Sequence, residues 1–336
     1  IYIPITRGEL WDESEEKKNR RLAIYAVLSE VLKTLDILIH PFCPFTSENL
    51  YQTVFEGKQS ILLDKWPQYQ ESLVDEEIEE SFDIMKDVVS ISSAARMKGK
   101  LKRRWPLNEA QICVKKNQKA KLESLSDLLK SQLNVEKFNI IETEEDSGLE
   151  QLLELKKLGL PVKVTLELER KKIGPKAKQH MGKLVSTFLE TNPDEIIPIL
   201  EKDGKYDFNI DDQKISLDKE DFIVDFDAGN NFAVAKRDDF TVFISTLRNK
   251  EMMAKGLVKD IARRLQTLRK ERGYNPTDVL EVASILELDN ESLEMIKGRD
   301  EELAFLVRVK KVNFEKSCKE YKEDDIDGQK IKISVE

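Results

Sequence analysis

The sequence predicts a multidomain protein in which an all-α helix bundle is followed by α+β domains. Its 336 residues correspond to two or three domains at about 100–200 residues each. Apolar residues recur at helical spacing before Pro106, whereas strand-like alternation begins after it. We therefore expect a helix bundle over residues 1–106, a small α+β domain over 107–170 and a C-terminal α+β domain over 171–336.

Three helices of the bundle can be placed from the sequence. Apolar residues at three- and four-residue steps predict a helix over 12–39, which Pro41 ends. A second helix is expected from 44–46 to Gly57, and an extended piece from 60 to 66. The third, over about 74–97, has an acidic first turn and a basic last turn, which suits the helix dipole.

Beyond the bundle, short strands and helices alternate. Strands are expected at 110–115, 135–141, 161–168, several places within 205–247, 279–286, 308–314 and 330–335. Helices are expected at 118–132, 148–157, from Gly174-Pro175 to about 190, from Pro193, at 250–272 and around 291–297. This mixture is typical of α+β domains.

Composition excludes several classes of protein. Hydrophobic residues make up 40% of the chain, which is enough for a core, but no stretch reaches the ~20 apolar residues of a membrane span. Three distant cysteines, Cys43, Cys113 and Cys318, form neither a disulfide framework nor a zinc pattern, so we expect a reducing cytoplasm and no metal site. The missing initiator Met suggests a fragment of something longer.

The net charge of −9, from 55 Lys and Arg against 64 Asp and Glu, taken alone argues against a nucleic-acid binder. However, the average hides a segment with six cations and no acid, which we call the basic strip. Its candidate RNA-contacting residues are Arg96, Lys98, Lys100, Lys102, Arg103, Arg104 and Trp105.

In an extended chain, Lys98, Lys100 and Lys102 would share one side, after Gly99 lets the helix end. Trp105 would then stack on a base or pack under Pro106. Two interpretations stay open: a strip that contacts phosphate or RNA, and a solvated helix end that complements its own dipole.

A second basic face is expected on the helix over 250–272. Lys259, Arg263, Gln266 and Lys270 are spaced by four, three and four residues, which places them on one side, and Arg263 and Lys270 are candidate RNA contacts. The alternative is an ordinary amphipathic helix with a basic exterior. Near the N-terminus of the chain, Trp11 is more typical of a side chain that covers the end of the helix bundle than of one on which a ligand stacks.

No catalytic site is predicted. Residues 180–183 (HMGK) look like the HIGH motif of class I synthetases, but no strand of a nucleotide-binding domain precedes them, so we interpret the match as chance. The sequence contains neither GxxxxGK[ST] nor GxGxxG nor a KMSKS-type loop, so no nucleotide cradle is expected.

Three stretches resemble the C-terminal half of isoleucyl-tRNA synthetases. Residues 7–12 (RGELWD) with 40–51 (HPFCPFTSENLY) are similar to the anticodon-binding bundle shared with valyl and leucyl enzymes. Residues 100–107 (KLKRRWPL) are similar to the N-x-K-x-R-x-P-L stretch, with Trp105 where a small polar residue is commoner. Residues 255–271 (KGLVKDIARRLQTLRKE) resemble a helix characteristic of isoleucyl enzymes.

The absence of a cysteine-rich zinc module, together with Gly174-Pro175-Lys176, resembles the archaeal and eukaryotic-like branch. The resemblance implies that the full-length enzyme charges isoleucine tRNA using ATP and magnesium. This chain would then lack the catalytic and editing domains, hold no cofactor, and grip the anticodon stem-loop as part of a cytoplasmic monomer. It would also contact its own N-terminal catalytic domain. A valyl-type fragment and a stand-alone, non-catalytic RNA-binding module are the alternatives.

Overall fold

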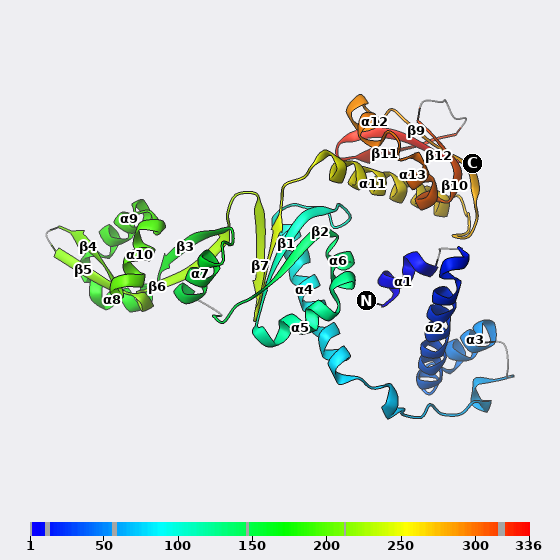
Figure 1. Cartoon of the computed structure of the whole chain (residues 1–336), viewed down its shortest axis with the longest axis horizontal. Coiled ribbons are helices and arrows are strands. Elements are labelled where there is room, and N and C mark those ends of the chain that lie inside the picture. The colour runs from blue at the N-terminus through cyan, green and yellow to red at the C-terminus, as the bar shows by residue number, and fades with distance from the viewer. Residues whose placement is uncertain (1, 11–13, 56–58, 146–147, 212, 315–319) are drawn as a thin grey trace. The chain divides into compact units, whose positions relative to one another are not determined.

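The computed structural model forms two compact units, Ile1–Phe82 and Asp83–Glu336 (Figure 1). The residues that the structure describes are 2–10, 14–55, 59–145, 148–211, 213–314 and 320–336. Trp11, Cys318 and Gly57, the expected end of the second helix, therefore lie outside the described residues. The chain is multidomain and mixes helices with several small sheets, as the sequence predicts.

The first unit contains only helical elements in its described part. Their bounds are α1 (Tyr2–Leu10), η1 (Glu15–Lys17), α2 (Lys18–Ile39), α3 (Pro44–Val54), η2 (Ile61–Leu63) and η3 (Glu71–Leu73). The expected start of α3 is confirmed, with Pro44 in its first turn. An extended segment was expected over 60–66, but residues 61–63 form the 3₁₀ helix η2. The Ser60 hydroxyl caps this helix by accepting a hydrogen bond from the Leu62 amide.

Helices α2 and α3 are joined to the segment after them by polar contacts. Tyr51 donates a hydrogen bond to Asp64 (2.8 Å), and Lys33 forms an ion pair with the same carboxylate (2.8 Å). Apolar side chains of α2 nevertheless remain exposed, Leu22 at 56% and Leu35 at 47%. The closed all-α bundle expected over residues 1–106 is therefore not confirmed.

Helix α4 (Glu76–Lys98) leads into the second unit. There a four-stranded sheet has the order β2-β1-β8-β7, with β1 and β2 parallel and the other pairs antiparallel. Its elements are β1 (Leu107–Val114), α5 (Lys116–Ser124), α6 (Ser126–Leu133), β2 (Val135–Glu142), β7 (Phe232–Arg237) and β8 (Phe240–Ser245). The single helix expected over 118–132 is two helices, which meet at Leu125. Strands β1 and β2 precede the expected domain boundary at residue 170, and β7 and β8 follow it. The division of the chain into three domains stays a prediction.

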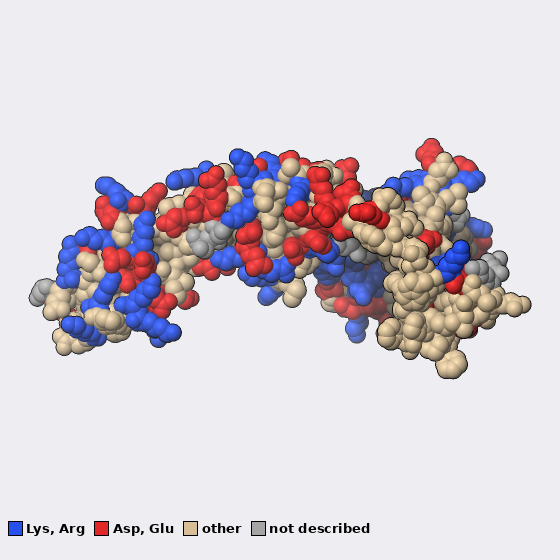
Figure 2. Space-filling view, turned by 90° about the horizontal axis from the view of Figure 1, so that it is seen from below, with Lys and Arg blue, Asp and Glu red and all other residues tan. Residues whose placement is uncertain are grey.

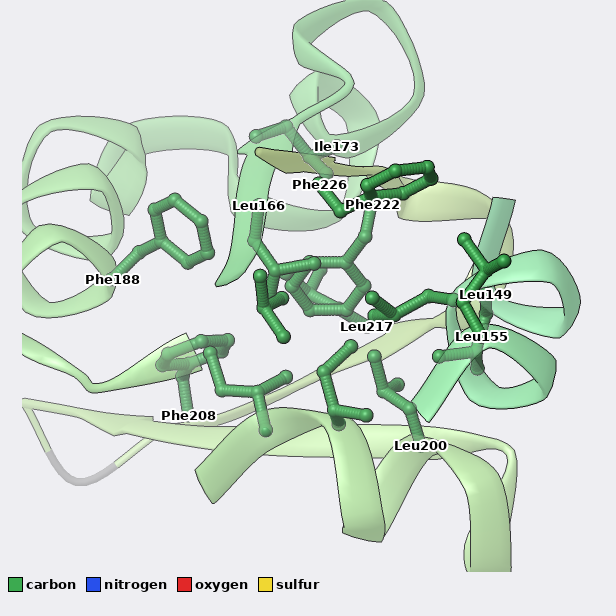
Figure 3. Close-up of a cluster of buried hydrophobic side chains, with 14 of the residues drawn as sticks. Leu149, Leu155, Leu166, Ile173, Phe188, Leu200, Phe208, Leu217, Phe222 and Phe226 are labelled. Atoms are coloured by element: carbon green, nitrogen blue, oxygen red, sulfur yellow. The ribbon is translucent and has the colours of Figure 1, made fainter. Parts of the chain in front are cut away.

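A second cluster of elements surrounds the largest core. They are α7 (Gly148–Lys157), β3 (Val162–Leu168), α8 (Arg170–Ala177), η4 (Lys178–His180), α9 (Met181–Glu190), α10 (Pro193–Asp203), β4 (Lys205–Ile210), β5 (Gln213–Asp218), η5 (Lys219–Asp221) and β6 (Phe222–Ala228). Strand β3 pairs with β6, and β4 with β5. Ile173, Phe188, Phe208 and Phe226 point into the space between them (Figure 3). Gly174-Pro175 lies inside α8, so the expectation that this pair opens a helix is wrong.

The C-terminal elements form a separate core, in which helix α11 packs on a sheet of order β10-β9-β12-β11. The bounds are α11 (Lys250–Glu271), β9 (Leu280–Leu286), α12 (Asn290–Ile296), α13 (Asp300–Val307), β10 (Val309–Asn313), β11 (Lys322–Ile326) and β12 (Gln329–Val335). The expected apolar side of α11 is confirmed, since Leu257, Val258, Ile261, Leu265 and Leu268 are all buried. The sequence did not predict α13 or β11, because both are short and carry three acidic residues each.

Candidate nucleic-acid interface

The basic strip begins where α4 ends. The backbone amide of Leu101 donates to the Arg96 carbonyl (2.8 Å), and Lys100, rather than Gly99, takes the left-handed conformation, with φ of 52°. Gly99 is needed for a different reason: a Cβ there would lie 3.0 Å from the Cβ of Ala233. Lys98 is still helical, and residues 99–100 and 103–104 form turns, so the expected extended strip with Lys98, Lys100 and Lys102 on one side is wrong.

Arg96 is buried, with 3% of its surface exposed, although the sequence suggested an RNA contact. Its guanidinium donates to four backbone carbonyls: Lys102 (3.0 Å), Trp105 (2.9 Å), Leu133 (2.8 Å) and Asn134 (3.1 Å). Burial, together with the charges of Arg103 and Arg248, lowers the pKa of Arg96 to about 10, so it stays protonated at neutral pH. These hydrogen bonds tie the strip to the end of α6.

Trp105 is also buried and packs against α11. Its indole N–H donates to the carboxylate of Asp260 (2.9 Å), and the space beside its ring exists because residue 256 is glycine. The charged groups of Lys102 and Arg248 lie 5.2 and 5.0 Å from the ring centroid, within the range of cation–π attraction. The ring is thus occupied by contacts within the protein.

The Asp260 carboxylate contacts three side chains of the basic strip. Its carboxylate is buried and accepts from Lys102 (2.9 Å) and Trp105 (2.9 Å), with the Arg104 guanidinium 3.4 Å away. Lys102 also forms an ion pair with Asp327, in the turn between β11 and β12. Lys102 and Arg104 are therefore paired with acids of the same unit.

The electrostatics of Asp260 predict an acid-sensitive contact. Burial raises the pKa of this carboxyl, but hydrogen bonds from Lys102 and Trp105 and the charges of Lys102 and Arg104 outweigh it, so the pKa lies below its usual value. A carboxyl whose pKa is lowered by folding stabilises the fold above its unfolded pKa of about 3.9, and this contribution is lost as pH falls through the folded pKa.

Replacing Asp260 with Asn should therefore destabilise the second unit at pH 7 and flatten its response to acid. The urea midpoint of the unchanged chain and of Asp260→Asn would be measured between pH 7 and pH 3. The stabilisation begins to fall near the unfolded pKa of about 3.9 and is lost only below the lower folded pKa, so we expect the difference between the two curves to narrow as pH falls from about 4 towards 3. Curves that stay parallel would show that Asp260 does not contribute in its charged form.

Three cations of the strip remain exposed: Lys98, Lys100 and Arg103. Among the residues that the structure describes, none provides a hydrogen bond or ion-pair partner for their side chains. The backbone carbonyl of Arg103 accepts from the Asn134 side chain (3.2 Å), which fixes this position while the guanidinium stays in solvent. These three side chains are free to meet a ligand from outside.

The basic face expected on α11 likewise contains some side chains with partners inside the unit and some without. Lys259 lies near the Asn134 side chain (3.4 Å) and Gln266 donates to the Leu306 carbonyl (2.7 Å), so both make contacts inside the unit. Burial lowers the pKa of Lys259. Arg263 and Lys270 are exposed, and within the described part of the chain their side chains have no hydrogen-bond or ion-pair partner. They lie seven residues apart, which is two helical turns.

Sequence reasoning missed Gly256 and Asp260, the residues of α11 that receive Trp105. One signal was present: a glycine inside a helix costs about 1 kcal/mol relative to alanine, so it suggests close packing. An aspartate four residues later lies on the same side of the helix. Arg269, another cation of α11, is buried and donates to carbonyls including those of Arg308 (2.9 Å) and Asp278 (2.7 Å).

Among the described residues, no group of three or more His, Cys, Asp and Glu side chains is arranged to hold a metal ion. In the same part of the chain, no helix is long and apolar enough to cross a membrane. The Cys113 thiol is buried, and burial raises its pKa to about 12, which makes it unreactive.

Comparison with known proteins defines the class. Residues 1–112 match the family model described as the anticodon-binding domain of tRNA ligase, and the matched range includes α1–α4 and all of the basic strip. This part of the chain is therefore similar to the class of anticodon-binding domains of tRNA ligases.

Nearly the whole chain is similar to part of known isoleucine–tRNA ligases. It is 28% identical to the isoleucine–tRNA ligase of Methanothrix thermoacetophila over 99% of this chain and 31% of that protein. With those of Sulfolobus acidocaldarius and Pyrococcus furiosus the identity is 27%, over 93% and 94% of this chain and 28% of each relative. The chain thus spans less than a third of the length of these relatives.

Proposed function

We propose that this chain is the tRNA-recognition portion of an isoleucine–tRNA ligase and that it binds the anticodon stem-loop of isoleucine tRNA. The observation that carries the proposal is the match of residues 1–112 to an anticodon-binding domain, within a chain related to isoleucine–tRNA ligases along nearly its whole length. Isoleucine activation, and the ATP and magnesium that it uses, belong to the rest of the ligase.

The contact surface that we propose consists of the exposed cations of the strip and of α11. Lys98, Lys100 and Arg103 would contact phosphates, which supply most of the affinity and fix the position of the RNA. Arg263 and Lys270 would extend this surface along α11. Their freedom from ion pairs within the described residues supports the assignment, because a phosphate then displaces only water.

The other four members of the strip, which are buried or partly buried, have a different role in this proposal. Arg96 and Trp105 hold the loop to α6 and α11, and Lys102 and Arg104 are anchored by Asp260. All four are positioning residues that keep the exposed cations in a fixed arrangement, which reduces the entropy lost when RNA binds.

We also propose that α2, α3 and the beginning of α4 form a helix bundle in the complete ligase. Leu22, Leu32 and Leu35 supply the apolar side that such packing requires, since all three are about half exposed in the isolated chain. In this proposal the bundle, the α+β domain over 107–170 and that over 171–336 form the three parts of the chain.

Replacing Lys98, Lys100 and Arg103 with Gln should weaken binding to an isoleucine tRNA anticodon stem-loop without unfolding the protein. Loss of three phosphate contacts should reduce the magnitude of the slope of log K against log salt by about 2. Binding would be measured by fluorescence anisotropy over a salt series from about 50 to 200 mM, and the thermal midpoint by calorimetry.

A control variant with the same net charge separates a local contact from general electrostatics. Lys116, Lys163 and Lys311 are exposed lysines on α5, β3 and β10, and replacing all three with Gln removes the same number of positive charges. We expect this control to bind nearly as well as the unchanged chain. An unchanged slope in the strip variant would refute the assignment of the strip, and absence of salt-dependent binding by the unchanged chain would refute the proposed function.

A further inference from the structure

A second cation-rich segment lies outside both basic faces discussed so far. Residues 170–189, which form α8, η4 and most of α9, contain six Lys and Arg and no Asp or Glu. This is as many cations as in the basic strip. Lys and Arg side chains are prominent on the part of the surface that α8–α10, β4 and β5 form, at the left of Figure 2.

The fold directs part of this segment outward. Ile173 and Ala177 of α8 and Phe188 of α9 are buried in the largest core, where Figure 3 shows Ile173 and Phe188 pointing inward. Lys171 precedes Ile173 by two residues, which places it on the far side of α8 at about 100° per residue. Its side chain is exposed, and so are those of Arg170 at the start of the helix and Lys178 directly after its end.

The other three cations of the segment are neutralised by acids of β4–β5 and η5. Lys172 pairs with Glu220 (3.2 Å), Lys176 with Asp218 (2.8 Å) and Asp221, and Lys183 with Asp211. These carboxylates are therefore already paired.

Arg170, Lys171 and Lys178 remain without such partners. Within the described residues, no carboxylate forms an ion pair with any of them. The acids that neutralise their neighbours are already engaged, so these three cations are the unpaired ones of the segment among the described residues. An incoming anion would not have to compete with an existing ion pair at these three positions.

The backbone at Lys178 is the second observation. Its φ of 43° and ψ of −119° lie in a region that favours glycine, and holding a lysine there costs free energy. The Lys178 side chain makes no hydrogen bond or ion pair with any described residue that would offset this cost. Strain of this kind accumulates at sites where a side chain is held for a ligand.

We propose that Arg170, Lys171 and Lys178 form a second phosphate-binding surface that contacts the RNA backbone of the tRNA. This inference rests on the proposed function and adds a separate site to it. The described residues 170–190 present no exposed aromatic ring, so they offer no platform for base stacking. The contact is therefore made to phosphates and is independent of nucleotide sequence.

The test uses the whole chain and a full-length isoleucine tRNA transcript. Replacing Arg170, Lys171 and Lys178 with Gln should weaken binding roughly tenfold near 0.1 M salt and reduce the magnitude of the salt slope by about 2. The scattered control at Lys116, Lys163 and Lys311 should leave both nearly unchanged. Because the contact is independent of sequence, an unrelated tRNA should lose the same factor of affinity.

Lys178→Gly gives an independent measurement if the triple variant is unstable. It removes one cation and places glycine at a positive φ, so the thermal midpoint should rise by about 1–4 °C while the salt slope falls by roughly 0.7. A lower midpoint would overturn the role assigned to backbone strain.

The outcomes separate the two proposals. If the unchanged chain binds the tRNA and the Arg170, Lys171 and Lys178 variant binds with the same affinity and slope, this inference is overturned and the proposed function stands. If the unchanged chain binds neither the tRNA nor the stem-loop, both are overturned. A loss that is specific to this variant, with intact binding by the control, supports the second surface.

Discussion

Replacing Arg96 with Met should lower the free energy of unfolding of the second unit by about 3–5 kcal/mol. The guanidinium is buried and donates to carbonyls from two separate segments, residues 102–105 and 133–134. Methionine fills part of the volume but supplies no donor, so the buried carbonyls of Trp105 and Leu133 would lose a charged hydrogen bond. Arg96→Lys should recover only part of the loss, because an ammonium lacks the planar fork of donors.

Tryptophan fluorescence provides the measurement. The chain contains three tryptophans, Trp11, Trp66 and Trp105, and only the last lies in the second unit. With Trp11 and Trp66 changed to Phe, urea unfolding followed by fluorescence reports on Trp105 alone. Arg103→Met is the matched control, since this exposed arginine lies in the same loop and its loss should change the free energy by no more than about 0.5 kcal/mol. Equal midpoints for the two variants would mean that the buried hydrogen bonds contribute nothing.

Gly256→Ala should destabilise the second unit by about 2–3 kcal/mol, although alanine is the better helix former. A Cβ at this position would lie 2.4 Å from Cδ2 of Trp105, far inside van der Waals contact. The ring cannot withdraw easily, because its N–H is held by Asp260. Either the indole or helix α11 must move, and the fixed arrangement of the strip would be lost with it.

Gly182→Ala is the control for this substitution. Gly182 lies inside α9, and no atom of another described segment lies within 4 Å of the Cβ that alanine would add, so alanine should stabilise the chain by up to about 1 kcal/mol. Combining Gly256→Ala with Trp105→Phe should cost less than the sum of the two single changes, since the smaller ring leaves room for the methyl group. If the double variant loses as much free energy of unfolding as the two single variants together, the effect of Gly256→Ala does not arise from the contact with Trp105.

Periodic patterns in the sequence predicted the elements whose formation depends on local residues. The helix over 148–157 and the buried side of α11 were both confirmed, because apolar spacing of three and four residues identifies the face that a core must cover. Short elements such as α13 were missed, since eight residues with an acidic first turn give too little periodicity. The resemblance to isoleucyl-tRNA synthetases could also be read from residues 255–271 alone.

What the sequence alone determined was the multidomain α+β class, the resemblance to tRNA ligases and the presence of a basic strip. Only the tertiary structure decided which cations of the strip are free. Arg96 and Arg103 are chemically identical and seven residues apart, yet one is buried and the other exposed. The difference arises because the Arg96 guanidinium meets carbonyls 37 and 38 residues away, and Trp105 meets an aspartate 155 residues away. Such partners are set by the packing of distant segments, which no local pattern of charge contains.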